Sequence, residues 1–167
     1  MGCFCLYNNR TKSDKFDFSQ ISIISINFDE DINKLLSLEK KSFDNKAFTL
    51  KCFTKLYNKS RKTSTFLILK YKNELIGYIL AYLNDDNEGY IASLLILEEF
   101  RGKGLSSLLI DKVLELFIMS ECNIDKISLH VRVTINLYSK YDFQIKDTIK
   151  KFYDKNEDAY FMVKILK

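Results

Sequence analysis

The sequence predicts a mixed α/β fold in a single domain, and three observations support this prediction. The chain has 167 residues, enough for one domain with a full core and not comfortably enough for two. Hydrophobic residues make up 47% of it and charged residues 29%, as in a soluble globular protein. Apolar runs typical of strands alternate with apolar residues at helical spacing, in the order β, α, α, three β, α, β, α, two β. This order predicts a mixed sheet, antiparallel at first, with a parallel crossover after the strand at Tyr90.

The expected elements follow from apolar periodicity and from the polar turns between apolar runs. Residues 1–19 are polar and aperiodic after the first six, so we expect a flexible extension there and the domain over 20–167. Acidic residues at 29–31 precede a helical apolar stripe. In order, we expect a strand at 21–28, helices at 29–45 and 46–57, a hairpin of strands 66–71 and 75–83, a strand at 90–97, a helix at 105–119, a strand at 127–133, a short helix at 136–140, and a closing hairpin of strands 143–153 and 159–166.

The loop between the strand at 90–97 and the following helix carries the first functional signal. It contains Arg101-Gly102-Lys103-Gly104-Leu105-Ser106. Two glycines let the backbone turn tightly, two cations flank the turn, and the first N–H groups of the helix lack carbonyl partners. Such a loop can hold a pyrophosphate. Its spacing matches neither the GxxxxGK[ST] of a P-loop nor the GxGxxG of a dinucleotide site. The alternative is a glycine-rich turn with solvated charges.

The overall charge and the cysteines exclude several classes of function. The net charge of +4 suits an anionic ligand, but no basic block or aromatic signature indicates nucleic-acid binding. The chain has one histidine and no CxxC pair, so we expect no metal site. We expect the four cysteines to be reduced thiols in a cytoplasmic protein. No apolar run approaches the roughly 20 residues of a membrane span, and no secretory segment is present.

The first five residues, Met1-Gly2-Cys3-Phe4-Cys5, raise a second possibility for location. Myristate on Gly2 and palmitate on Cys3 or Cys5 would form a two-signal membrane anchor. The acceptor pattern requires Ser or Thr at position 6, where this chain has Leu6. A disordered tail is therefore the favoured interpretation, and we expect membrane attachment only if the N-terminus is acylated.

Several motifs resemble those of one protein family. Arg101, Gly104 and Ser106 resemble the Q/R-x-x-G-x-G/A coenzyme A loop of the GNAT acetyltransferases, with Ser in place of Gly or Ala. The order of elements is also that of the GNAT fold. Segments 127–143 and 151–162 resemble the L-H/E-V-R…N…LY.K..F segment and the YY…EDAY.M hairpin of the protein Nα-terminal acetyltransferases, of the NatA and NatE type.

Three departures from this family pattern bear on the function. The chain is about four residues shorter between Arg132 and Leu137. Asp142 replaces the glycine of the K-x-G-F turn, and Asp44 replaces the proline that commonly follows the aromatic at Phe43. These departures leave coenzyme binding expected and peptide selectivity open.

The resemblance implies transfer of acetyl from acetyl-coenzyme A to the α-amino group of a protein N-terminus, in a ternary complex without metal. It places the coenzyme against Leu94, Leu95, Ile96, Arg101, Gly102, Lys103, Gly104, Leu105, Ser106 and Ser107, and against Asn136 if the shortened segment keeps Asn136 in the family position. It places the peptide against Phe43, Asn45, Ala92, Phe152 and Tyr153. N–H groups near Leu95 and Ile96 would donate hydrogen bonds to the thioester oxygen, which requires a local irregularity in the strand. An auxiliary or ribosome-associated subunit remains open.

Three side chains are candidates for the chemistry. An α-amine titrates near pH 8, so roughly a tenth of it is neutral at pH 7 and a general base is useful. His130 is the only histidine, and strand alternation places it with Ser128 and Arg132, off the more apolar face. In the family, such a His works through water with a Tyr matched here by Tyr90, and a Tyr matched by Tyr138 protonates the coenzyme sulfur. The alternative is a hydrogen-bonded structural His and two packing tyrosines.

Two other functions stay open. The acceptor could be a lysine side chain, a polyamine or another small amine, although the aromatic residues of the 151–162 hairpin favour a peptide. The domain could also bind coenzyme A or a partner protein without catalysis, and the shortened segment before Tyr138 is the best support for that reading.

Overall fold

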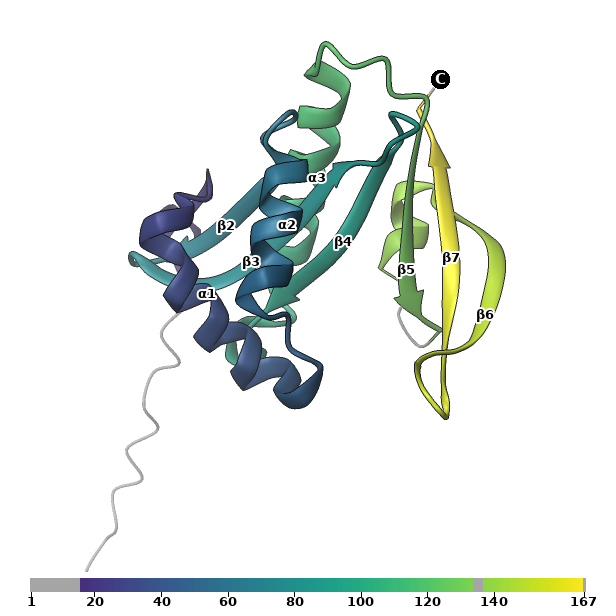
Figure 1. Ribbon diagram of the computed structural model, residues 1–167. Helices are drawn as coiled ribbons and strands as arrows, with labels where there is room; N and C mark the ends of the chain where they lie inside the picture. Colours follow the sequence, from purple (N-terminus) through teal and green to yellow (C-terminus); the bar gives the residue numbers. More distant parts are fainter. Residues whose placement is uncertain (1–15, 134–136, 167) are drawn as a thin grey trace, which may run out of the picture.

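The computed structural model describes residues 16–133 and 137–166. Its centre is a seven-stranded sheet with the strand order β1-β2-β3-β4-β5-β7-β6. Figure 1 shows α1 and α2 on one face of the sheet and α3 on the other. The helices and strands are β1 (Ile21–Ser25), α1 (Phe28–Phe43), α2 (Leu50–Ser60), β2 (Phe66–Tyr71), β3 (Glu74–Leu83), β4 (Gly89–Ile96), α3 (Leu105–Met119), β5 (Lys126–Arg132), β6 (Gln144–Asp154) and β7 (Glu157–Ile165). The 3₁₀ turns are η1 (Phe18–Gln20), η2 (Asp44–Lys46), η3 (Glu98–Phe100) and η4 (Tyr138–Tyr141).

The sheet separates two hydrophobic cores. Leu109 and Phe117 of α3 pack against one face, where Ile79 is fully buried. Leu35 of α1 and Phe53 of α2 pack against the other face. Strand β3 is covered on both sides, and this explains why its sequence is an almost continuous apolar run instead of an alternating one.

The parallel contact between β4 and β5 is short. Only three residue pairs form, and the last joins Ile91 to Leu129. Just beyond it, the register between β3 and β4 shifts, leaving Ala92 as an extra residue in β4. The sheet therefore consists of two halves, β1–β4 and β5–β7, which Figure 1 shows separating from one another along β4 and β5.

The predicted mixed α/β fold is confirmed, and the bounds of some elements are corrected. The second helix begins at Leu50 and not near Lys46, because the Thr49 side chain caps it by accepting the Cys52 N–H at 3.3 Å. The first strand ends at Ser25. The expected helix at 136–140 is a 3₁₀ turn at 138–141, and residues 134–136 lie outside the described residues. The closing hairpin is longer than expected, with its turn at 155–156.

The structure covers only part of the N-terminal extension that the sequence predicts. The proposed acylation sites Gly2, Cys3 and Cys5 lie outside the described residues. The description begins at Phe16, whose ring stacks on Tyr71 with centroids 4.7 Å apart. No helix in the described part of the chain is both long and apolar enough to cross a membrane.

Candidate active site

The end of β4 offers backbone groups that the sheet does not use. Beyond Ile91, this strand pairs only with β3. The Leu97 N–H donates to the Ile76 carbonyl at 2.9 Å, toward β3. Since alternate residues of a strand direct their N–H groups to opposite edges, Leu95 also faces β3, whereas Leu94 and Ile96 face the open edge. The irregularity that frees donors is therefore the end of pairing with β5, and the free N–H groups belong to Leu94 and Ile96.

The loop after β4 is a backbone cradle. Gly102 and Gly104 both have left-handed backbones, with φ of +74° and +77°, and Gly104 is the N-cap of α3. No backbone N–H from residues 102–106 donates a hydrogen bond within the described part of the chain. A Cβ built on either glycine would meet no atom within 4 Å. Free donors at a helix N-terminus, facing open space, suit a phosphate.

The two cations of this loop are held at its edges. Arg101 Nε donates to the Ile96 carbonyl at 3.0 Å, on the open edge of β4. Lys103 Nζ donates to the Glu99 carbonyl at 3.2 Å and lies 5.4 Å from the ring centroid of Phe16. Neither cation forms an ion pair with a carboxylate of the described residues, so both charges are available to an anion. Leu105 is buried beneath the loop, while Ser106 and Ser107 are half-buried on the first turn of α3.

Two predicted catalytic residues meet where β4 and β5 part. The Tyr90 hydroxyl and His130 Nδ1 lie 2.8 Å apart. Burial lowers the pKa of His130, so its imidazole is neutral at pH 7. Burial, with the nearby Tyr82 and Tyr153, raises the pKa of Tyr90 to about 12, so its phenol keeps its proton. The pair therefore offers one acceptor at neutral pH: His130 Nε2 if Nδ1–H donates to the tyrosine, or the Tyr90 oxygen if its proton points to Nδ1.

Aromatic side chains surround the histidine. The Phe152 ring stacks on the imidazole with centroids 4.6 Å apart and planes 5° apart, and Phe161 lies at 5.0 Å. The Tyr153 hydroxyl donates to the His130 carbonyl at 2.9 Å. Phe152 and Tyr153, predicted to line the peptide groove, thus fix both the ring and the backbone of the candidate base.

Tyr138 lies apart from that pair. It is 6% exposed, belongs to the core beneath α3, and meets the edge of the Phe143 ring at 5.7 Å. Burial raises its pKa well above the ordinary value, so the phenol keeps its proton at neutral pH. No hydrogen bond to its hydroxyl is found among the described residues, and no buried side-chain oxygen there lacks a partner.

The remaining candidates are divided between the two halves of the sheet. Phe43, at the end of α1, and Ala92, at the β4 bulge, pack against the core under α1 and α2. Asn45 lies in η2, and its side chain is not among those described. Asn136 falls outside the described residues. A hollow at the C-terminal end of α3, lined in part by Asn87 and Met119, contains none of the candidate residues.

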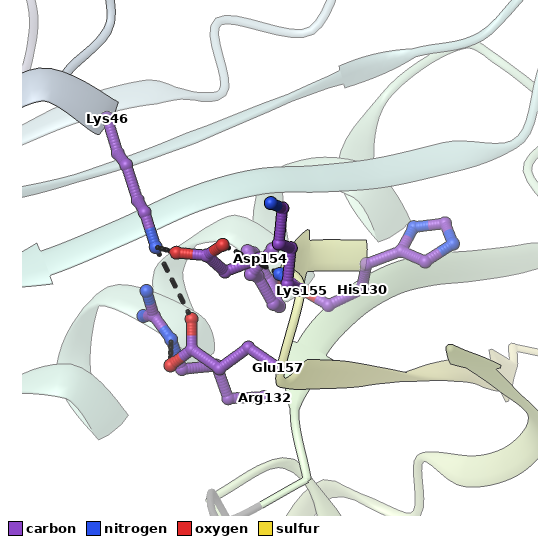
Figure 2. A network of polar contacts seen from close by, with 7 residues as sticks. Lys46, His130, Arg132, Asp154, Lys155 and Glu157 are labelled. Carbon is purple, nitrogen blue, oxygen red and sulfur yellow. Dashed lines mark hydrogen bonds and ion pairs between the residues drawn. The ribbon is translucent and has the colours of Figure 1, made fainter. Parts of the chain in front are cut away.

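Two polar networks next to the site were not anticipated from the sequence. Buried Glu39 accepts the Tyr78 hydroxyl at 2.6 Å and the Phe48 N–H at 3.1 Å, and Tyr78 also contacts Ser93 at 2.8 Å. In the second network, Lys46 reaches carboxylates of the β6–β7 turn (Figure 2). The first network could have been predicted from Glu39, a glutamate inside an apolar helical stripe. The second network joins segments far apart in the sequence, and no sequence pattern indicated it.

Comparison with known proteins identifies the family. Residues 30–143 match the family model described as acetyltransferase (GNAT) family. The chain therefore belongs to the GNAT acetyltransferases, as the loop at 101–106 predicted.

Individual relatives narrow the comparison. The N-alpha-acetyltransferase daf-31 of Caenorhabditis elegans is 33% identical over an alignment of 107 residues that covers 59% of this chain and 58% of that protein's length. The structure of Ard1 from Thermoplasma volcanium superposes with a TM-score of 0.76 at 24% identity, covering 89% of this chain and 99% of that one. Arabidopsis thaliana Naa50, in complex with a bisubstrate analogue, has a TM-score of 0.69 at 24% identity, covering 87% and 98%. These likenesses confirm the GNAT fold.

Proposed function

We propose that this chain is an N-acetyltransferase that moves acetyl from acetyl-coenzyme A to the α-amino group of protein N-termini. The observation that carries the proposal is the Tyr90–His130 pair, held at 2.8 Å at the point where β4 and β5 part. It places a neutral proton acceptor beside a strand edge with a free N–H. The 33% identity with the N-alpha-acetyltransferase daf-31 supports the same reaction.

The residues present fit the coenzyme. Free N–H groups at 102–106, the open space at Gly102 and Gly104, and the charges of Arg101 and Lys103 would hold its diphosphate. Leu94 and Ile96 would receive the adjoining amide chain along the open edge of β4. When bound, acetyl-coenzyme A supplies the activated acetyl thioester.

Each group of the site then has a role in the reaction, and the protons that are taken up and released are accounted for. The Tyr90–His130 pair takes a proton, directly or through a water, as the amine nitrogen forms its bond to the acetyl carbon. An N–H on the open edge of β4, from Leu94 or Ile96, would donate to the thioester oxygen, where negative charge develops in the reaction. Tyr138 stays protonated at neutral pH because burial raises its pKa, and it would supply the proton that the departing coenzyme sulfur needs. A structural His alone would not need a tyrosine hydroxyl, a free strand edge and a glycine cradle in one place.

The acceptor is best assigned to a peptide. Phe152 is 44% exposed although it stacks on His130, so one aromatic face is left for a ligand next to the base. A peptide N-terminus can use that face together with the half-buried Phe43 and Tyr153. We further propose a cytoplasmic enzyme, with an auxiliary subunit and N-terminal acylation left to experiment.

A peptide panel tests the proposal. Acetyl transfer is measured, by release of the coenzyme thiol, onto peptides with free α-amines, the same peptides with only a lysine amine, and polyamines. Faster turnover of the α-amines is expected. Faster turnover of lysine or polyamines would overturn the acceptor assignment. His130→Gln and Tyr90→Phe should each lower kcat by about 10²-fold or more; unchanged rates would show that the assigned chemistry is wrong.

A further inference from the structure

An ion pair crosses between the two segments that border the candidate acceptor site. Lys46, in η2 between α1 and α2, places Nζ 3.0 Å from Asp154 Oδ2 and 3.7 Å from Glu157 Oε2. Asp154 ends β6 and Glu157 begins β7, so both carboxylates belong to the closing hairpin. Figure 2 shows the lysine reaching across to this hairpin from the opposite half of the molecule.

The same network continues to the strand that carries the candidate base. Arg132 Nε donates to Glu157 Oε1 at 2.9 Å. The Arg132 guanidinium lies 4.8 Å from the ring centroid of Tyr153, and Tyr153 donates to the His130 carbonyl. The position of Lys46 is therefore linked through charges and one ring to the backbone of His130 on β5, the strand that also carries Arg132 (Figure 2).

The ion pair lies at the outer end of the acceptor site. Lys46 follows Phe43 within three residues, and Asp154 directly follows Tyr153. Phe43 and Tyr153 are the groove residues proposed on the two sides of the site. With these residues on its two sides, a peptide whose first amine reaches His130 would continue between η2 and the β6–β7 turn. Its next residues therefore pass the Lys46–Asp154 contact.

The two sides of this contact are not equivalent when it opens. Asp154 keeps the Lys155 N–H, which donates to Oδ1 at 2.6 Å, and Glu157 keeps Arg132. Lys46 loses both of its carboxylates, and no other ion pair to it is found in residues 16–133 and 137–166. Its side chain is about half exposed, so opening is easy and an incoming group can reach the ammonium. When the ion pair opens, the side chain left without a charged partner is therefore the Lys46 ammonium.

We propose that Lys46 determines substrate specificity by favouring peptides that carry a carboxylate close behind the first residue. That carboxylate takes the place of Asp154 on the lysine. This inference rests on the proposed function of the site and names its substrate class more closely. Lys46 lies beyond the reacting atoms, so its effect falls on KM for the peptide and leaves kcat unchanged.

Matched peptides test the inference in the full-length protein. One peptide series keeps the first residue constant and moves a single Asp along the following positions, and a second series carries Asn instead. At low salt the wild type should prefer the best Asp peptide by about two- to fivefold in kcat/KM, the range of an exposed ion pair. The preference should disappear in Lys46→Gln and should shrink at high salt, where exposed charges are screened. Lys155→Gln removes one positive charge from the β6–β7 turn that Lys46 contacts, and it should keep the preference.

Exchanging the charges of Lys46 and Asp154 tests whether the peptide contacts residue 46 directly or responds only to the overall charge. In Lys46→Glu/Asp154→Lys, Glu157 keeps Arg132, and opening leaves an anion on the η2 side. The preference should then pass to peptides with Lys in place of Asp. An unchanged preference in Lys46→Gln, or an equal loss in Lys155→Gln, would overturn the inference. If the wild type acetylates no peptide α-amine, the proposed function itself is wrong; if it acetylates them without dependence on Lys46, only the inference fails.

Discussion

At the scale of single residues, the neutral His130 sets the expected pH dependence. Because burial lowers the pKa of His130, the imidazole remains a base below pH 6.5. We expect kcat/KM to rise with pH through a pKa below 6.5, and to rise again as the peptide amine loses its proton near pH 8. Tyr90, with a pKa of about 12, does not titrate in this range.

Two variants distinguish the two rises of kcat/KM with pH, which we call the lower and upper limbs of the profile. His130→Gln should remove the lower limb and keep the upper one, because the upper limb belongs to the substrate. Tyr90→Phe should lower the rate while both limbs stay. A lower limb that persists in His130→Gln, measured over pH 5 to 9 with one peptide, would mean that another group is the base.

The buried carboxylate of Glu39 makes a second prediction at this scale. Its pKa is raised chiefly by burial, against the lowering effects of the Tyr78 hydroxyl and the Phe48 N–H. Tyr78→Phe removes the first of these donors and should cost about 1–3 kcal/mol of the free energy of unfolding. A carboxyl whose pKa is raised on folding binds more protons in the native state, so stability falls as pH rises past the ordinary pKa of glutamate.

Urea denaturation at two pH values checks this sign. The cost of Tyr78→Phe should be larger at pH 7 than at pH 4, because more of Glu39 is charged at the higher pH. In the background of Glu39→Gln the pH dependence of that cost should vanish. A cost that is equal at both pH values would show that Tyr78 stabilises the core by packing alone.

At the scale of elements, local sequence predicted nearly every helix and strand. Apolar periodicity located β2 to within a residue, and the glycines located the start of α3. Thr49 marks the start of α2, which periodicity alone set near Lys46, because Phe48 also fits the apolar stripe. The contacts of the candidate site could not be predicted, because they depend on the register between strands. The Tyr90–His130 contact needs Tyr90 beside Ser128, and the free Ile96 N–H needs the pairing to end at Leu129.

The loop before α3 allows a prediction that separates backbone strain from ligand contact. Gly104 has a φ of +77° and open space where a side chain would lie. Gly104→Ala should destabilise the protein by about 1–2 kcal/mol, because alanine disfavours this backbone conformation. Gly104→Asn should recover part of that loss, since Asn tolerates the left-handed region.

Coenzyme affinity should not follow stability in these two variants. Both side chains would occupy the space proposed for the diphosphate, so both should weaken acetyl-coenzyme A binding at least tenfold by calorimetry. A Gly104→Asn protein that binds the coenzyme as tightly as the wild type would place the diphosphate elsewhere.

At the scale of the whole molecule, the coenzyme is expected to join two halves that the sheet connects weakly. Only three residue pairs link β4 to β5. The proposed contacts at Ile96 and residues 102–106 belong to one half, and Tyr138 in η4 follows β5 in the other. A ligand that touches both should stabilise the molecule as a unit. At a hundred times Kd, binding to the folded state alone adds about 2.7 kcal/mol, which corresponds to roughly 5–10 °C in Tm for a chain of this size.

Hydrogen exchange shows whether that stabilisation spans both halves. With saturating acetyl-coenzyme A, amides at 96 and 102–106 should be protected together with those of η4, because one ligand bridges them. Gly104→Asn, at the same ligand concentration, should show a smaller rise in Tm and less protection at both places. Protection limited to the loop would mean that Tyr138 does not reach the coenzyme. In that case the proton for the departing sulfur would have to come from another donor, and the separation of β4 from β5 would serve the acceptor peptide alone.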